Sequence, residues 1–409
     1  MRSLQHLPEA SGKAHRGIMG GTGFSEAEQE RERAALATLW LGTVMVISDI
    51  YVAQPILPLL SSSFGVSPAT ASLAVSLNIL ALSLALLVYG PVSDYVGRKS
   101  VMVTTGFLLA VPTALIAFTD TFSFFLLFRT MQGLLVAGIA AIAMAYIAEE
   151  FSSAVVGRMM GIYVSSMVAA GFLGRVLSGV LAGLFNWRIT FVVFSILNLA
   201  GAGIMLRFLP ASRHFKRSAG LFSSYAGMFG HLRNRRLVGA FLIAFMLFFT
   251  FTGSFTYITF YLSAPPFNLS PVFLGLIFVV YITGVLSPLA GALSSRIGRR
   301  PVIGMGLVIA GLGILLTLTG SLGLIIFGLL LLCAGLFSTQ PAAGALVGDN
   351  AATSKGSATS LYLFSYYIGG SAGAALPGLI WSAYGWPGVI AVCLAALLIA
   401  FISLFTLCK

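Results

Sequence analysis

The chain alternates long apolar stretches with short polar segments along nearly its whole length. Each stretch is about 20 residues long or longer, which is the length an α-helix needs to cross the hydrocarbon core of a bilayer. The stretches lack the strict apolar and polar alternation of membrane β-strands, so we expect helices. Twelve are predicted, near residues 35–60, 70–92, 100–119, 122–149, 157–184, 187–209, 237–262, 271–294, 301–319, 322–348, 357–383 and 387–407.

Composition supports the same interpretation. Of the 409 residues, 58% are apolar and only 8% are charged. A water-soluble globule of this size needs more polar surface than that. We therefore predict an all-α membrane protein with twelve transmembrane helices.

A short basic turn bounded by glycines occurs twice. It begins at Gly90 and again at Gly291, each time between the second and third apolar stretches of its half. Such a duplication is typical of two pseudo-symmetric six-helix bundles related by an axis along the membrane normal. The expected organisation is a cytoplasmic N-terminal tail (1–34), a first bundle (35–209), a cytoplasmic inter-bundle loop (210–236), part of which (221–233) could form a surface helix, and a second bundle (237–409).

The duplication extends to the fifth and eleventh helices. Glycines at 171, 174 and 179 align with glycines at 370, 373 and 378. Small residues at these positions let helices approach closely. Two interpretations of these glycines remain open: ordinary tight packing, and packing that permits the helices to slide over each other.

The net charge of +12 is explained by topology. Of the 23 basic residues, fourteen lie in loops after even-numbered helices, and only Arg188 lies in a loop after an odd-numbered helix. This asymmetry places both termini and the even loops in the cytoplasm. Nucleic-acid binding is therefore not expected, and anionic lipid of the inner leaflet is the only partner that the charge implies.

The turn from Gly90 to Ser100 resembles the G-x-x-x-D-x-x-G-R-K/R signature of the major facilitator superfamily. The second copy has Ser295 where the first has Asp94. The resemblance implies a cytoplasmic latch that holds the two bundles together while the cavity is open outward. The residues assigned to it are Gly90, Asp94, Gly97, Arg98, Lys99, Glu149, Glu150 and Arg299.

Within the latch, Arg98 lies one turn from Asp94, and Glu149 or Glu150 ends the neighbouring fourth helix. The Asp94 carboxylate can also approach the positive N-terminal end of the eleventh helix. A purely topological basic loop would explain Arg98 and Lys99 but would leave Asp94 unexplained.

Other motifs point to proton-coupled members of the superfamily. The segment from Arg129 to Gly133 resembles their R-x-x-x-G motif, and Asp49 followed by Pro58 resembles the first-helix pattern of drug:proton antiporters. The fifth helix departs from the antiporters because it lacks their Gly-Pro pair. Segments at 54–60, 185–188 and 361–367 look like those of YnfM-type bacterial inner-membrane transporters, which implies a bacterial cytoplasmic membrane.

Three charged residues lie deep in the apolar stretches: Asp49, Arg129 and Arg175. Each costs about 2.5 to 3.5 kcal/mol in hydrocarbon, so we expect them to face the central cavity or one another. Asp49 is the candidate for the protonated group, and Gln54 is assigned to the same cavity. The alternative is a structural pair of Asp49 and Arg129 that fixes helix packing.

Arg175 leaves the charge of the substrate open. Two deep arginines against one acid leave a positive charge that could bind a carboxylate or phosphate of the solute. Equally, Arg175 could point to the outer mouth or donate to backbone carbonyls beside its flanking glycines.

The sequence as a whole predicts a secondary active transporter that works by alternating access. The preferred activity is proton-coupled efflux of small amphipathic or drug-like compounds. The alternative is proton-coupled transport of a defined metabolite, such as a sugar or organic anion. The expected partners are a small-molecule substrate, protons and the bilayer, and the protein is expected to act as a monomer.

Other classes of protein are disfavoured. An enzyme would need a nucleophile and base or clustered metal ligands, and the apolar stretches contain no histidine. The three cysteines have neither metal-ligand nor redox spacing, so we expect no metal and no cofactor. A phosphate-binding Gly-x-x-x-x-Gly-Lys-Ser/Thr loop and a charged pore ring are also lacking.

Overall fold

The computed structural model describes residues 26–151, 153–212, 230–351 and 355–408, and those residues form α-helices and short 3-10 helices. Helix α1 begins at Glu26, within the residues assigned to the tail. Most of that tail, and residues 221–229 of the surface helix expected at 221–233, lie outside the described residues.

The first bundle contains six spans. The first span is broken into α1 (Glu26–Ile47), η1 (Ser48–Tyr51), η2 (Gln54–Ile56) and α2 (Leu57–Phe64). The fourth span consists of two helices, α5 (Phe122–Ala140) and α6 (Ala143–Glu150). The others are continuous: α3 (Pro68–Val96), α4 (Arg98–Ile116), α7 (Ser153–Leu184) and α8 (Trp187–Phe208).

The second bundle repeats this order. Its second span is broken into α11 (Pro271–Leu276), the 3-10 segment η3 (Ile277–Leu286) and α12 (Ser287–Ile297). The remaining helices are α10 (Arg235–Ser263), α13 (Arg299–Leu316), α14 (Leu322–Asn350), α15 (Lys355–Ala375) and α16 (Gly378–Thr406).

Eleven of these spans are long and apolar enough to cross a membrane. The twelfth is α15, which is richer in Ser, Gly and Tyr and packs against α10 and α3 rather than standing apart from the bundles. The all-α prediction with two six-helix bundles is therefore confirmed.

The eleventh span contains a break that the sequence did not predict. It was expected at 357–383, and within it α15 ends at Ala375 before the chain resumes as a helix at Gly378. Pro377 disfavours a helical conformation at the residue before it, which accounts for the break. Non-helical backbone at Gly385, whose φ of 55° is in the region that favours glycine, divides α16 into the end of the eleventh span and the twelfth span, which agrees with the predicted end at 383 and start at 387.

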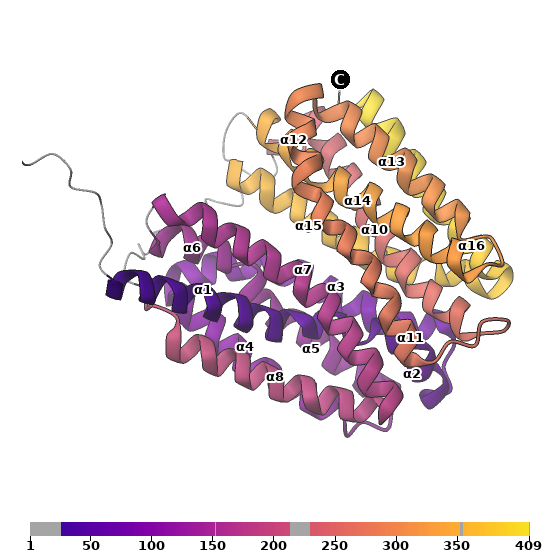
Figure 1. The fold of residues 1–409 in the computed structure, drawn as a ribbon, viewed down its shortest axis with the longest axis horizontal. Coiled ribbons are helices and arrows are strands. Elements are labelled where there is room, and N and C mark those ends of the chain that lie inside the picture. Colours follow the sequence, from indigo (N-terminus) through magenta and orange to yellow (C-terminus); the bar gives the residue numbers. More distant parts are fainter. Residues whose placement is uncertain (1–25, 152, 213–229, 352–354, 409) are drawn as a thin grey trace, which may run out of the picture.

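The two bundles diverge from one end to the other (Figure 1). We call the end that carries the turns at Gly97 and Gly298 the basic end, and the opposite end, where α2 and α11 lie, the far end. In Figure 1 the bundles approach each other near α2 and α11 and separate toward α6 and α12. The bundles therefore form a V whose apex is at the far end.

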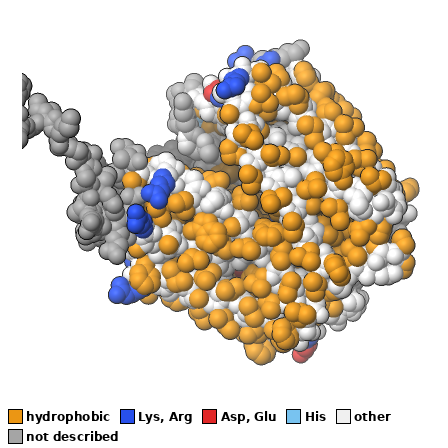
Figure 2. All heavy atoms as spheres, in the orientation of Figure 1, with side chains coloured by type: hydrophobic (Ala, Val, Ile, Leu, Met, Phe, Trp, Pro, Cys, Tyr) orange, Lys and Arg blue, Asp and Glu red, His pale blue; other side chains and the backbone are white. Residues whose placement is uncertain are grey.

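Most of the visible surface is apolar. Figure 2 shows hydrophobic side chains over both bundles, with Lys and Arg gathered at the edges. Exposed Leu, Val, Ile and Phe side chains occur on nearly all the spans. Such a surface is suited to lipid rather than to water.

Candidate functional site

The break in the first span is stabilised by Arg129. A 3-10 segment leaves backbone carbonyls without their usual helical partners, and these groups need donors inside a membrane. The Arg129 guanidinium donates to the carbonyls of Asp49 (3.1 Å) and Ile50 (2.9 Å) in η1 and to that of Ala74 in α3 (3.1 Å). Arg129 is fully buried and thereby ties α5 to η1 and α3.

Asp49 lies in the same buried region but does not pair directly with Arg129. Among the described residues, no ion pair within 4.0 Å joins its carboxylate to a basic side chain. Both carboxylate oxygens lie 3.4 Å from the Thr113 hydroxyl. The Arg129 guanidinium donates instead to the Asp49 backbone carbonyl, so the two residues lie in one buried region of the first bundle.

Three further polar side chains complete this group. Gln132 accepts from Arg129 (2.7 Å) and donates to the Thr113 hydroxyl (2.8 Å). Asn198 donates to the same hydroxyl (3.2 Å). We call Asp49, Thr113, Arg129, Gln132 and Asn198 the polar cluster. It connects four spans of the first bundle.

The glycine of the R-x-x-x-G motif has a packing role. A Cβ on Gly133 would lie 2.1 Å from the carbonyl oxygen of Asn78. Only glycine therefore allows α5 to come this close to α3. Asn78 in turn donates to the Arg129 carbonyl (2.8 Å), so the motif fixes the backbone from which Arg129 projects.

Arg175 is held between the bundles. Its Nη1 donates to the carbonyl of Gly171 (2.6 Å), and its Nε donates to the Gln54 side-chain oxygen (2.7 Å). The guanidinium carbon is 4.0 Å from the ring centroid of Tyr51 in the first bundle and 5.0 and 4.8 Å from those of Phe278 and Tyr281 in the second. Cation–π contacts of this kind are favourable where water is excluded.

The bundles are joined at the far end by hydrogen bonds that cross between them. Gln54 donates to Thr256 in α10 (3.3 Å). The hydroxyls of Ser76 in α3 and Ser371 in α15 lie 3.0 Å apart, and Ser371 also lies 2.9 Å from the Ser76 carbonyl. We call this contact region the far-end seam.

Close backbone contact extends the seam. A Cβ on Gly179 of α7 would lie 2.5 Å from the carbonyl oxygen of Pro271 and 2.7 Å from the Cα of Gly275 in α11. A Cβ on Gly378 of α16 would lie 2.9 Å from the Cα of Ala69 in α3. These glycines allow the bundles to touch without intervening side chains.

The basic turns have matching contacts in the two bundles. Arg98 forms a two-point contact with Glu149 (3.1 and 2.7 Å), donates to Ser93 and pairs with Asp94. Arg299 pairs with Asp349 (3.1 Å) and donates to Ser294 (2.9 Å).

The glycine before each arginine is required by its backbone. Gly97 has a φ of 107° and Gly298 a φ of 95°, which only glycine adopts readily. Each glycine therefore ends one helix and lets the next begin at once with the arginine.

The remaining latch residues have separate surroundings. Lys99 donates to the carbonyls of Leu206 (2.8 Å) and Leu209 (2.6 Å), so it caps the C-terminal end of α8. Gly90 lies inside α3 with open space around it, and Glu150 is half-buried at the end of α6. The structure thus brings Asp94, Arg98 and Glu149 together and adds the Gly90 carbonyl, which accepts from Arg98 at 3.5 Å, whereas Lys99 has separate partners.

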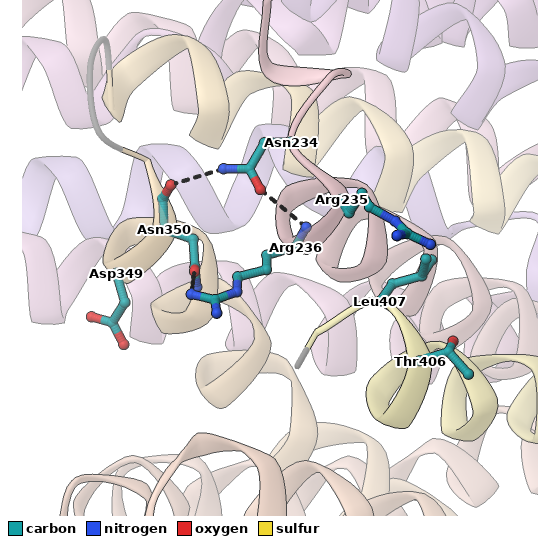
Figure 3. Close-up of a pocket in the computed structure, with 7 residues that line it drawn as sticks. All are labelled: Asn234, Arg235, Arg236, Asp349, Asn350, Thr406 and Leu407. Atoms are coloured by element: carbon teal, nitrogen blue, oxygen red, sulfur yellow. Dashed lines mark hydrogen bonds between the residues drawn. The ribbon is translucent and has the colours of Figure 1, made fainter.

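One hollow lies apart from these residues. It has a volume of about 620 Å³ at the basic end of the second bundle, where the start of α10 meets the ends of α14 and α16 (Figure 3). Arg236 reaches the Asn350 side chain there at 3.5 Å. Its lining mixes arginines with Asp349, and it is remote from the deep charges. The described residues also contain no cluster of three metal-ligating side chains.

Sequence reasoning missed Thr113, Asn198 and Asn78 as members of the buried network. Each lies deep within a strongly apolar helix, where a polar side chain is a signal that could have identified it. In the sequence, Gln132 stood out only as part of the R-x-x-x-G segment. Its hydrogen bonds to Arg129 and Thr113 could be identified only from the packing of the helices.

The chain matches the family model described as Major Facilitator Superfamily over residues 39–283 and 262–408. It is 39% identical over 356 residues to the inner membrane transport protein YnfM of Escherichia coli (strain K12), covering 86% of this chain and 85% of that protein. It is 35% identical to the uncharacterized MFS-type transporter YybF of Bacillus subtilis (strain 168), covering 86% and 87%.

Solved structures have the same fold. A bacterial homologue of the human lysosomal transporter Spinster, in an inward-facing, unoccupied conformation, aligns with a TM-score of 0.79 at 17% identity, over 92% of this chain and 97% of that one. A point mutant of the nucleoside transporter NupG aligns with a TM-score of 0.78 at 14% identity, over 92% and 100%. Together with the duplicated basic turns and the two six-helix bundles, the family match and the relatives establish that this chain belongs to the major facilitator superfamily.

Proposed function

We propose that this multi-pass membrane protein is a proton-coupled exporter of small amphipathic compounds in a bacterial cytoplasmic membrane. The basic end faces the cytoplasm in this proposal, following the distribution of basic residues. The protein alternates between the V closed at the far end and a second arrangement closed at the basic end.

The observation that carries the proposal is the position of Asp49. It is the one carboxyl group of the sequence inside the apolar part of a span, and it lies fully buried beside a break in the helix. Charged groups at such depth are retained mainly where they serve transport. Thr113, at 3.4 Å, offers a neutral partner to a carboxyl group that gains or loses a proton.

The break in the first span gives Asp49 a connection to the seam. Asp49 and Tyr51 belong to η1, and Gln54 begins η2, so the proton site and the inter-bundle contacts share one short irregular segment. A change in the charge of Asp49 would therefore act on backbone carbonyls that Arg129 holds and, further along the same segment, on the Gln54 contact with Thr256.

Proton coupling is tested in everted membrane vesicles. With Asp49→Asn we expect proton-driven uptake to be lost while substrate counterflow, which needs no net proton movement, continues. Asp120→Asn is the matched control, because that acid is 90% exposed at the far end and pairs only with Arg188 among the described residues. Intact proton-driven uptake in Asp49→Asn would overturn the proposal.

The substrate is tested by growth of a pump-deleted host that expresses the protein, challenged with cationic, neutral and anionic toxic compounds. Protection supports export. Absence of protection combined with accumulation of a labelled sugar or organic acid would support the alternative, a carrier for a defined metabolite.

We further propose that Asp94, Arg98 and Glu149 form the latch at the basic end in the second arrangement. Their contacts described above lie within the first bundle, and closing the V would bring Asp94 toward the first turn of α15. Asp94→Asn should reduce transport with normal membrane insertion, whereas Ser295→Ala, at the equivalent position of the second bundle, should not. Equal transport in the two variants would contradict the latch.

A further inference from the structure

Arg175 is a buried cation without a counter-charge. It is 3% exposed, and none of the four ion pairs among the described residues involves it. The sequence has eleven acids: five lie between residues 9 and 32, five lie at the ends of spans, and the remaining one is Asp49 in the polar cluster. A buried charge that lacks an opposite partner is unfavourable in a membrane protein.

The guanidinium also retains hydrogen-bonding capacity. Nε and Nη1 are occupied by Gln54 and Gly171, but Nη2 makes no hydrogen bond with the described residues. The aromatic rings of Tyr51, Phe278 and Tyr281 contact its faces, and such contacts leave the N–H groups in the guanidinium plane available.

A second polar group beside Arg175 is also unsatisfied. The Tyr281 hydroxyl is buried and has no hydrogen-bond partner among the described residues, although its ring centroid lies 4.8 Å from the Arg175 guanidinium carbon. A buried hydroxyl left unpaired costs free energy, and such groups in native proteins call for an explanation.

Apolar surface adjoins these two donors. The Tyr281 ring packs at 5.0 Å from Phe251 and 5.9 Å from Phe337. Both phenylalanines line a small hollow with Gln340 and Tyr366, two half-buried side chains of the second bundle. A ligand with an acidic group and an apolar body would meet complementary surfaces there.

We infer that Arg175 and Tyr281 bind the carboxylate of an amphipathic, singly charged organic anion, and that this class is the cargo. The carboxylate accepts from Nη2 of Arg175 and from the Tyr281 hydroxyl, which neutralises the buried cation and satisfies both donors. The apolar body lies against Phe251 and Phe337. The inference rests on the proposed transport function, since it names the charge of the solute that is carried.

The two donors belong to different bundles, Arg175 to α7 and Tyr281 to η3. An anion held by both would therefore contribute to the contact between the bundles, as Gln54 and Thr256 do in its vicinity. Binding of cargo would then act directly on the arrangement that alternates during transport.

The test uses the purified full-length protein and three probes with one scaffold: 4-phenylbutyrate, 4-phenylbutyramide and 4-phenylbutylamine, which are anionic, neutral and cationic at neutral pH. Affinity is measured from the ligand-dependent shift in melting temperature, with no proton gradient. We expect the carboxylate to bind about tenfold or more tightly than the amide and the amine, because only the carboxylate offers the guanidinium a charged acceptor, and hydrogen bonds to charged groups are stronger than neutral ones.

Variants identify the donors. Arg175→Gln should abolish the preference for the carboxylate, Arg175→Lys should retain part of it, and Tyr281→Phe should weaken carboxylate binding while leaving some preference. Arg188→Gln removes an arginine that is exposed at the far end and should change nothing. If Arg175→Gln does not fold, Arg175→Lys and Tyr281→Phe still decide the question.

Equal affinity for the three probes, no binding of any of them, or an unchanged preference in Arg175→Gln would overturn the inference. These outcomes are separate from failure of the proposed function. Carboxylate binding without proton-driven transport would contradict proton coupling and support the anion site. Proton-driven transport of cations alone would support proton coupling and contradict the anion site.

Discussion

Arg98 and Arg299 make the same two kinds of contact at equivalent places in the two bundles. Each follows a glycine with positive φ, donates to a serine five residues earlier and pairs with an acid at the end of the fourth span of its bundle. The surroundings differ, because the Arg98 side chain is 11% exposed and that of Arg299 is 29% exposed. The two turns therefore share one geometry, and among the described residues only Arg98 has further partners, Asp94 and the Gly90 carbonyl.

Arg98→Gln should destabilise the protein more than Arg299→Gln. The first substitution leaves a partly buried Glu149 and Ser93 without their donor, and we expect the free energy of unfolding to fall by about 1 to 3 kcal/mol. Asp349 is 55% exposed, so loss of its partner should cost less than about 1 kcal/mol. Melting temperatures of the two variants in detergent measure both losses of stability. Equal losses would contradict the expectation drawn from the difference in burial.

Substitution of Thr113 should destabilise the protein more than substitution of another buried threonine of α4. Thr113→Val removes the acceptor for Gln132 and Asn198 and should lower the free energy of unfolding by about 1 to 3 kcal/mol, since two buried donors lose their partner. It should also slow proton-driven transport through loss of the contact with Asp49.

Thr105→Val is the control for that substitution. The Thr105 hydroxyl is buried on the same helix, and its hydrogen bonds within the described part of the chain go to the carbonyls of Val101 and Met102. The Thr105→Val variant should transport substrate at nearly the rate of the unsubstituted protein. Matching transport defects in the two variants would show that the polar cluster does not matter for coupling.

The sequence indicated the spans well because hydrophobic length is a local property. The boundaries at Val96 and Ile297, for example, are set by the glycines that follow them. It did not indicate the break at Pro377 inside the eleventh span, because the hydropathy does not change there. The pairing of Arg98 with an acid of the fourth span could be proposed because both lie next to loops at the same end.

The seam was beyond sequence reasoning. Gln54 and Thr256 are 202 positions apart and lie in different bundles, so their contact depends on how the two halves dock. Likewise, the sequence left two roles open for Arg175. In the structure Arg175 donates to the Gly171 carbonyl, which is the second of those roles. Arg175 also contacts aromatic rings of the second bundle, and no local sequence pattern indicates those contacts.

Tyr257→Phe should loosen the seam. The Tyr257 hydroxyl donates to the Ala374 carbonyl (2.9 Å) and lies 3.0 Å from the Ser72 hydroxyl across the boundary between the bundles. Spin labels at the exposed Ser62 and Ser321 would report a broader or longer distance distribution at the far end. Tyr163→Phe should leave that distribution unchanged, because its bond to Ala140 stays within the first bundle. A response in both variants would mean that the effect is not specific to the seam.

Gly179→Ala should shift the protein away from the arrangement closed at the far end. The added Cβ would lie 2.5 Å from the Pro271 carbonyl oxygen and 2.7 Å from the Gly275 Cα, and neither backbone atom can rotate away. Helices α7 and α11 must therefore separate, at a cost of about 1 to 3 kcal/mol. A cost of that size changes the ratio of the two arrangements by roughly 5- to 150-fold, so the far end should open measurably between the same spin labels.

Gly161→Ala is the control on the same helix, because the space around Gly161 is open. It should keep the far-end distance and should slightly favour the helix, since alanine is the better helix former. If Gly179→Ala instead keeps the far-end distance of the unsubstituted protein, the backbone contact between α7 and α11 cannot be what closes that end. The hydrogen bonds of Gln54 and Tyr257 would then have to carry the closure.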